Sequence, residues 1–93
     1  MLPVVWSHQA ETDLLALITY AAERHAAAAA RMGRAIRASA SPLPEHPPHL
    51  LKTSERMPSC REIVAHPNYI PIYRVGHASI EILRVRHARQ QYP

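Results

Sequence analysis

The chain has few of the residues that staple or ligate small proteins. Cys60 is the one cysteine among 93 residues, so an internal disulfide is excluded and a reducing compartment is indicated. Of the seven histidines, His46 and His49 are the one close pair, and Pro47 and Pro48 hold that segment extended. No Cys and His spacing matches a zinc site, so we expect no metal and no cofactor. Cys60 also lacks a neighbouring motif for a nucleophile, which favours a partly buried structural thiol.

Long apolar runs are also absent from the sequence. No run approaches the roughly 18 residues that a membrane-spanning helix needs. The first residues lack a basic segment followed by an apolar stretch, so no signal peptide is visible and we expect a cytoplasmic protein. Apolar residues make up 47% of the chain, enough for a folded domain. The length predicts one domain, residues 1–93, with a limited core that a partner can stabilise.

Positive charge is concentrated in the second half of the sequence. Residues 1–48 hold four basic and four acidic residues, whereas residues 49–93 hold seven basic and three acidic ones, the whole formal charge of +4. A one-sided basic surface suits an acidic partner, either nucleic acid or an acidic protein segment. Ten of the eleven basic residues are arginine, which favours two-point recognition of carboxylate or phosphate. The alternative is that these arginines only keep the domain soluble.

The first half of the chain reads as a short strand followed by a helical hairpin. Residues 2–6 are β-prone, with Pro3 placing them near a sheet edge. Ser7 suits a helix N-cap, because its hydroxyl can accept from a free N–H of the first turn. A helix over residues 8–24 then carries one apolar stripe, with Tyr20 predicted to pack, and that stripe comprises Leu14, Leu17, Ile18 and Ala21.

A second helix is predicted over residues 27–40. Gly33 lies close to its buried stripe and favours close helix packing, and that stripe comprises Ala28, Met32, Ala35, Ile36 and Ser39. Four prolines within residues 41–48 end the helix and predict a stiff, extended spacer. Residues 49–59 are irregular, with Leu50 and Leu51 positioned to pin the loop to the core.

Three strands are predicted in the last third of the chain, over residues 61–66, 69–75 and 79–86. Pro71 within the second of them predicts an edge position or a bulge. Strict alternation in the third puts one set of side chains on one face, Ile80, Ile82, Arg84 and Arg86, and another on the opposite face, Leu83, Val85 and His87. The predicted fold is α+β: a short N-terminal strand and an αα-hairpin packed on a small antiparallel sheet.

Segments along the whole chain resemble toxins of the RelE/ParE superfamily, and ParE in particular. The resembling segments, in order, are Trp6-Ser7 with Ala10-x-x-Asp13-Leu14, Leu43-x-x-His46-Pro47, Arg56-Met57-Pro58, Arg61-Glu62-Ile63-Val64-Ala65-His66-Pro67-Asn68-Tyr69, Tyr73-Arg74-Val75, and Ile80-x-Ile82-Leu83-x-Val85-x-His87-Ala88-Arg89-Gln90. Two departures stand out: Ser59-Cys60 replaces a common Gly-Thr, and residues 49–55 replace a glycine-containing, arginine-rich loop.

The resemblance implies the toxin of a type II toxin–antitoxin, or plasmid-stabilisation, pair. Such a toxin is bound in a hetero-oligomer by a small, partly disordered antitoxin, and contact with operator DNA is expected only through that antitoxin. ParE members typically poison DNA gyrase, whereas RelE members cleave messenger RNA on the ribosome. The small core and basic, partly apolar sheet predict a protein that is poorly behaved alone and stable in the complex.

Two kinds of chemistry follow from the resemblance. Cleavage of RNA needs a base, an acid and cations that hold the phosphate. Arg61, Arg84 and Arg86 are the candidates for the phosphate, and His87, Glu62 or Tyr92 for proton transfer. Tyr69 stands where some ribosome-dependent relatives carry an arginine, and His87 is better explained by a hydrogen bond that fixes the last strand to the tail.

The favoured alternative is a gyrase poison, which needs a binding surface and no catalytic residue. The predicted surface for the target and the antitoxin comprises Arg61, Tyr69, Arg74, Arg84, Arg86, His87, Arg89, Gln90 and Tyr92. Against it stands the interpretation that these arginines pair with Glu62 and Glu81 as a solvated face. An inactive toxin, or a basic domain that binds nucleic acid without arresting growth, remains a third alternative.

Overall fold

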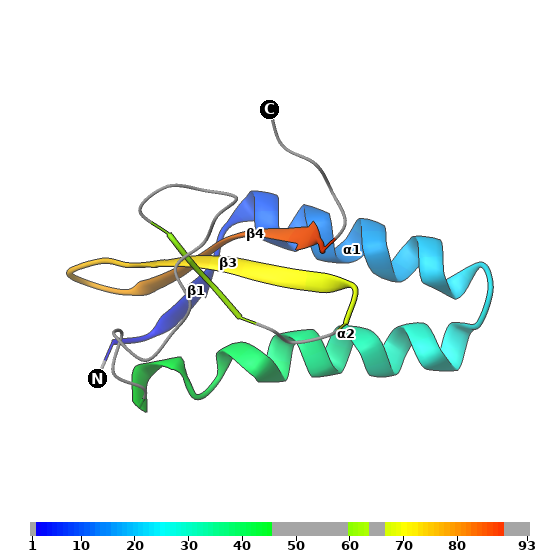
Figure 1. Cartoon of the computed structure of the whole chain (residues 1–93), viewed down its shortest axis with the longest axis horizontal. Helices are drawn as coiled ribbons and strands as arrows, with labels where there is room; N and C mark the ends of the chain where they lie inside the picture. Colours follow the sequence, from blue (N-terminus) through cyan, green and yellow to red (C-terminus); the bar gives the residue numbers. More distant parts are fainter. Residues whose placement is uncertain (1, 46–59, 64–66, 89–93) are drawn as a thin grey trace.

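A helical hairpin packs on a four-stranded sheet in the computed structural model, which describes residues 2–45, 60–63 and 67–88 (Figure 1). The α+β class and the short strand before the hairpin are as predicted. The elements follow in the order β1 (Val4–Trp6), α1 (His8–Ala22), α2 (Ala26–Ala40), a 3₁₀ turn (Leu43–Glu45), β2 (Arg61–Glu62), β3 (Tyr69–Val75) and β4 (Ile80–His87).

The sheet is mixed, with the strand order β1-β4-β3-β2. Strands β2, β3 and β4 pair antiparallel, as predicted, and β1 lies at an edge, as Pro3 indicated. β1 pairs in parallel with β4, however, with Val4 opposite Ile80. The sequence did not predict this pairing, because it joins segments from opposite ends of the chain and leaves no local signal.

β2 is shorter than predicted, because only Arg61 and Glu62 pair with β3 as a strand. The N–H of Ile63 still donates to the carbonyl of Pro71 at 3.0 Å. Pro71 therefore lies in a central strand, between β4 and β2, and the edge position predicted for it is wrong. The bulge is the better explanation, since the register of β3 and β4 shifts immediately after Pro71 and Ile72.

The bulge changes which residues of β4 face the helices. Ile72 pairs with Arg84 and Tyr73 with Ile82, so Leu83 is the extra residue of β4. The prediction from strict alternation is wrong at this point: Val85 is buried against α1 and α2 as Ile82 is. Past the bulge the alternation is out of phase, so Arg84 sits opposite Ile72, on the other face from the Val85 side chain.

α1 and α2 pack closely through a small residue. Gly33 is buried, and a methyl group at its Cα would meet Cδ1 of Ile18 at 2.6 Å, so the predicted role in close packing is confirmed. The buried stripe of α2 differs from the prediction and comprises Ala29, Gly33, Ile36 and Ala40. Ala35, placed in the stripe by the sequence, is exposed because α2 is rotated about its axis relative to the predicted face.

Several smaller predictions can also be compared with the fold. Tyr20 does not pack in the core: it is 56% exposed and lies against Arg24. Leu43 is buried within a 3₁₀ turn, so the spacer is not extended at that point. Cys60 is buried, more fully than predicted. Leu50 and Leu51 lie outside the described residues.

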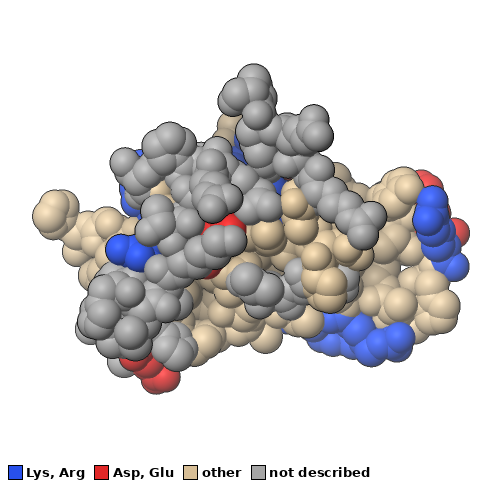
Figure 2. Space-filling view, in the orientation of Figure 1, with Lys and Arg blue, Asp and Glu red and all other residues tan. Residues whose placement is uncertain are grey.

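Basic side chains are visible over α2 as well as over the sheet (Figure 2). Residues 1–48 have no net charge, but their charges are unevenly distributed over the surface. Glu11 of α1 is bound by Arg37, and Asp13 of α1 is bound by Arg84 of β4. Because the acidic groups of α1 are used in this way, exposed positive charge is not confined to the sheet half.

Candidate functional site

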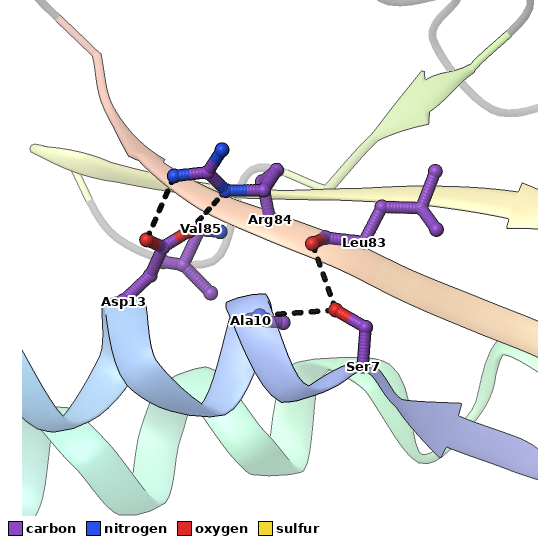
Figure 3. A network of polar contacts seen from close by, with 6 residues as sticks. All are labelled: Ser7, Ala10, Asp13, Leu83, Arg84 and Val85. Atoms are coloured by element: carbon purple, nitrogen blue, oxygen red, sulfur yellow. Dashed lines mark hydrogen bonds and ion pairs between the residues drawn. The ribbon is translucent and has the colours of Figure 1, made fainter.

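The junction of β1, α1 and β4 is organised by Ser7. Its hydroxyl accepts from the Ala10 N–H at 3.0 Å, which confirms the predicted N-cap. The same hydroxyl donates to the carbonyl of Leu83 at 2.9 Å, and the Ser7 N–H donates to the carbonyl of Ile82 at 2.9 Å. Ser7 thus starts the helix and holds the bulge of β4 beside it (Figure 3).

Asp13, six residues beyond Ser7 in α1, binds the edge of β4 beyond the bulge (Figure 3). Arg84 donates to both carboxylate oxygens, with Nε–Oδ2 at 2.8 Å and Nη2–Oδ1 at 3.0 Å. The Val85 N–H also donates to Oδ2, at 2.9 Å. β1 has ended by this point, so the carboxylate satisfies a strand N–H that would otherwise lack a strand partner.

The charge of Asp13 is stabilised by these contacts. Burial by itself raises the pKa of the carboxyl. The hydrogen bonds from Arg84 and Val85, together with the positive charges of Arg84 and Arg86, outweigh the burial and hold the pKa below its ordinary value. In the sequence Asp13 stood out only within a segment that resembles the toxin family, and its partners, 71 and 72 positions away, carry no local signal.

The C-terminal end of β4, two residues beyond Val85, brings an aromatic pair together. Tyr69 and His87 are register partners, with ring centroids 5.3 Å apart and ring planes at 89°, an edge-to-face contact. Arg86 lies beside them in the strand, paired in register with Ile70. The Ala88 N–H donates to the carbonyl of Asn68 at 2.7 Å and fixes this end of the hairpin.

The predicted surface residues do not all lie at one place. Arg74 is near the opposite end of β3, where it forms an exposed ion pair with Glu81 at 3.2 Å. This pairing agrees with the solvated-face interpretation, and such pairs contribute at most about 1 kcal/mol. Glu62, a candidate for proton transfer, is only 2% exposed. Arg61 lies beside Tyr73 on the neighbouring strand, and Arg89, Gln90 and Tyr92 lie outside the described residues.

A separate cavity of about 300 Å³ lies beside α1. It is lined by His8, Glu11, Thr12, Leu14, Leu15, Ile18 and Arg37. Arg37 donates to both oxygens of Glu11, at 2.9 and 2.6 Å, and also stacks over the ring of Trp6. The Glu11 carboxylate is thereby committed to an ion pair. Within the described part of the chain, no three His, Cys, Asp or Glu side chains gather as metal ligands, and neither helix is long and apolar enough to cross a membrane.

Comparison with known proteins agrees with this fold. A family model described as the ParE toxin of the type II toxin–antitoxin system parDE matches residues 4–92. The chain belongs to the ParE toxin family. A curated relative, Toxin RelE2 of Caulobacter vibrioides, is 35% identical over 89 residues, covering 95% of this chain and 97% of the relative.

Solved structures of toxins share the fold of this ParE family member. A chromosomal ParDE system from P. aeruginosa superposes with a TM-score of 0.81 at 22% identity, covering 94% of this chain and 96% of the other. YafQ from E. coli superposes with a TM-score of 0.60 at 15% identity, covering 95% and 94%. YafQ has also been crystallised in the DinJ-YafQ toxin-antitoxin complex, where the TM-score is 0.54 at 15% identity, covering 92% and 91%.

Together the matches make the chain a type II toxin of the RelE/ParE superfamily, as its sequence predicted. The names of the relatives span both branches, ParE and RelE. The cellular target is therefore a separate question, which depends on the residues of this chain.

Proposed function

We propose that the toxin arrests growth in the cytoplasm by poisoning DNA gyrase, and that it does so through a binding surface without catalysing a reaction. The observation that carries this proposal is that Arg84 is already bound by a carboxylate of the chain itself. A ribonuclease would use this residue as a cation on the scissile phosphate. Here its Nε and Nη2 donors are both directed at the Asp13 carboxylate.

Freeing Arg84 for a phosphate would be costly. The side chains of Arg84 and Asp13 are only 25% and 17% exposed. Removing one partner of a largely buried pair leaves the other charge uncompensated, and this costs more than the pair itself contributes. The Asp13 carboxylate would also repel the phosphate that approached. Arg84 is better explained as the residue that holds α1 against β4.

The proposed target surface is the end of the sheet where β3 begins and β4 ends. Tyr69 and His87 lie there, and Arg86 is next to His87 in β4 with its side chain on the opposite face of the sheet. Arg61 is opposite Tyr73, nearer the other end of β3. The tail residues Arg89, Gln90 and Tyr92 continue the chain from this end and belong to the same proposal. A surface of arginine and aromatic side chains resembles the centres of protein interfaces, where these residue types are enriched.

We also propose that a cognate antitoxin neutralises the toxin by binding it. The complex of the relative YafQ with DinJ supports this partner. Large apolar side chains are exposed on β1, α1 and β3, at Val5, Leu15 and Val75, with Leu15 at 65% exposure. An amphipathic, acidic segment that folds on binding would cover such side chains and pair with the excess positive charge.

The test is to add purified toxin to gyrase, relaxed plasmid and ATP, with ribosomes translating a defined message in a parallel reaction. We expect supercoiling to be lost and cleaved plasmid to accumulate, while the message stays intact. Growth after induction without the antitoxin is expected to stop with double-strand breaks.

Other outcomes would overturn the proposal. Intact supercoiling together with cleaved messages on ribosomes would identify a RelE-type endonuclease, and Arg61, Arg84, His87 and Tyr92 would then be the residues to substitute. Undisturbed growth would identify an inactive toxin or a basic binding domain.

A further inference from the structure

α2 carries an uninterrupted basic and small-residue face on its solvent side. The helix contains three arginines and no acidic residue. Its buried stripe is centred between Ala29, Gly33 and Ile36. With about 100° between successive residues, the line directly opposite that stripe is occupied by four exposed residues, Ala27, Arg31, Arg34 and Ala38. Two arginines therefore lie at the centre of the outer face, with methyl groups on either side along the helix.

These two arginines differ from the other basic residues of the hairpin. Arg37 is bound by Glu11 through two hydrogen bonds, and Arg24 donates to the Tyr20 hydroxyl at 2.9 Å. Among the residues that the structure describes, no carboxylate pairs with Arg31 or Arg34. In Figure 2 the basic atoms along α2 have no acidic atoms beside them, whereas acidic and basic atoms are neighbours at the tip of the hairpin. A face kept only for solubility would mix both signs.

The geometry of this face fits a row of closely spaced phosphates. Residues three apart on a helix are neighbours, displaced by about 4.5 Å along the axis. Phosphates follow one another along a DNA strand every 3.4 Å or so of the duplex axis. The guanidinium group binds phosphate oxygens in a two-point fashion. The first turn of α2 contains no acidic residue, so the positive end of the helix dipole adds to the same potential.

We propose that the outer face of α2, centred on Arg31 and Arg34, docks on the phosphate backbone of duplex DNA. The inference rests on the proposed function in one respect, since gyrase supplies the DNA on which the toxin would then sit. The toxin would contact its target with the end of the sheet and the bound DNA with α2. Such contacts position a protein without reading base sequence.

An acidic segment of the antitoxin is the alternative occupant, and the composition of the face argues against it. Protein segments that fold on binding anchor through apolar or aromatic side chains in the partner surface. The line from Ala27 to Ala38 offers only methyl groups and guanidinium groups, while the exposed large apolar side chains Val5, Leu15 and Val75 lie on other elements. Phosphate contacts need no such anchors.

The experiment titrates a fluorescent duplex of about 30 base pairs with the full-length toxin alone, by anisotropy, over a series of salt concentrations. Each arginine–phosphate contact contributes about 0.9 to the slope of log K against log salt. We expect R31Q/R34Q to weaken binding and to lower that slope by about 2, with R31Q and R34Q each lowering it by about 1. R31K/R34K, which keeps both charges, is expected to retain most of the slope.

R24Q is the matched control for the single variants, because it removes one exposed arginine of the hairpin that does not lie on this face. We expect it to leave the slope unchanged, and circular dichroism would verify that each variant is folded. An unchanged slope and affinity in R31Q/R34Q would overturn the inference. Normal DNA binding by R31Q/R34Q together with weakened binding of the antitoxin would also overturn the inference, and it would assign the face to the antitoxin. Gyrase is absent from the titration, so its result is independent of whether the toxin inhibits gyrase.

Discussion

Asp13 is the residue on which the junction of helix and sheet depends. It receives three hydrogen bonds, two from Arg84 and one from the backbone of Val85. Tyr73 is the opposite case, since its side chain is fully buried and its hydroxyl has no hydrogen-bond partner in the described part of the chain. The Asp13 carboxylate thus stabilises the fold, whereas the Tyr73 hydroxyl is buried without compensation for its lost hydration.

Asp13→Asn is expected to lower the free energy of unfolding at neutral pH by about 1–3 kcal/mol, because it weakens the bonds to a largely buried arginine. The pKa of Asp13 is lowered in the folded protein, so its contribution is present above the unfolded pKa, near 4, and is lost as the pH falls through the folded pKa. Urea denaturation from pH 7 to pH 3 would test this. The wild type should lose stability more steeply than the variant below about pH 4. If the free energies of unfolding of the two proteins changed with pH in parallel, this stabilising role of the Asp13 charge would be ruled out.

Tyr73→Phe is expected to raise the free energy of unfolding by up to about 1 kcal/mol, because it removes a hydroxyl buried without a partner. Burial raises the pKa of Tyr73, partly opposed by the charge of Arg61, which agrees with a hydroxyl shielded from water. Urea denaturation of both proteins gives the difference. Tyr69→Phe, the same substitution at a half-buried position, is the control. A loss of more than about 1 kcal/mol in Tyr73→Phe would show that the hydroxyl is hydrogen-bonded in solution.

At the scale of elements, the hairpin and the bulge set the positions of the site residues. Gly33 lets α2 approach α1 until the helix backbone meets Ile18. Leu83, the extra residue of β4, lies where β1 ends and α1 begins, and its carbonyl is bound by Ser7. The bulge lets Ile82 and Val85 both reach the helices. It also directs Arg84 toward the side of β4 beside α1, where its side chain binds Asp13.

The contact between Gly33 and Ile18 can be tested with a double-mutant cycle. Alanine is favoured over glycine in a helix by about 1 kcal/mol. In the wild type we expect Gly33→Ala not to show this stabilisation, because the new methyl group would lie 2.6 Å from Cδ1 of Ile18. In an Ile18→Val background, which lacks Cδ1, the same substitution is expected to stabilise by up to about 1 kcal/mol. Equal effects in both backgrounds, measured by thermal or urea denaturation, would contradict the contact.

The whole molecule combines a small core with an exposed basic face on α2, around Arg31 and Arg34. The end of the sheet near Tyr69 and His87 is the second surface proposed for binding. A domain of this length buries a modest share of its surface on folding, so its own stability is limited. We therefore expect binding to a partner to contribute a large part of the free energy that keeps the chain folded.

The antitoxin is therefore expected to change the melting temperature of the toxin markedly. Free antitoxin at 100 times its Kd adds about 2.7 kcal/mol, which for a domain of this size is roughly 10–20 °C. Differential scanning fluorimetry of the toxin with increasing amounts of the neighbouring gene's product would measure the shift. A scrambled antitoxin peptide of the same composition is the control for general charge effects. A melting temperature that does not depend on the antitoxin would contradict the expected partnership.

The sequence by itself determined the class of fold, both helices, the hairpin of β3 and β4, the N-cap at Ser7 and the family. These features rest on periodicity, turn residues and capping chemistry, which act between residues close together in the chain. The alternation within β4 was predicted correctly up to Ile82 and failed beyond Leu83. A bulge is a property of two strands and their neighbours, so one strand's pattern does not reveal it.

Only the tertiary structure showed what the candidate site residues contact. Arg84, the candidate for phosphate binding, is bound by Asp13, 71 positions away in the sequence. Arg74 was separated from Tyr69 and His87 by the length of β3, and Arg31 and Arg34 were left exposed because they lie on the side of α2 opposite its buried stripe. Charge pairing depends on distance in space, and for a chain folded on itself that distance is fixed by packing and not by sequence separation.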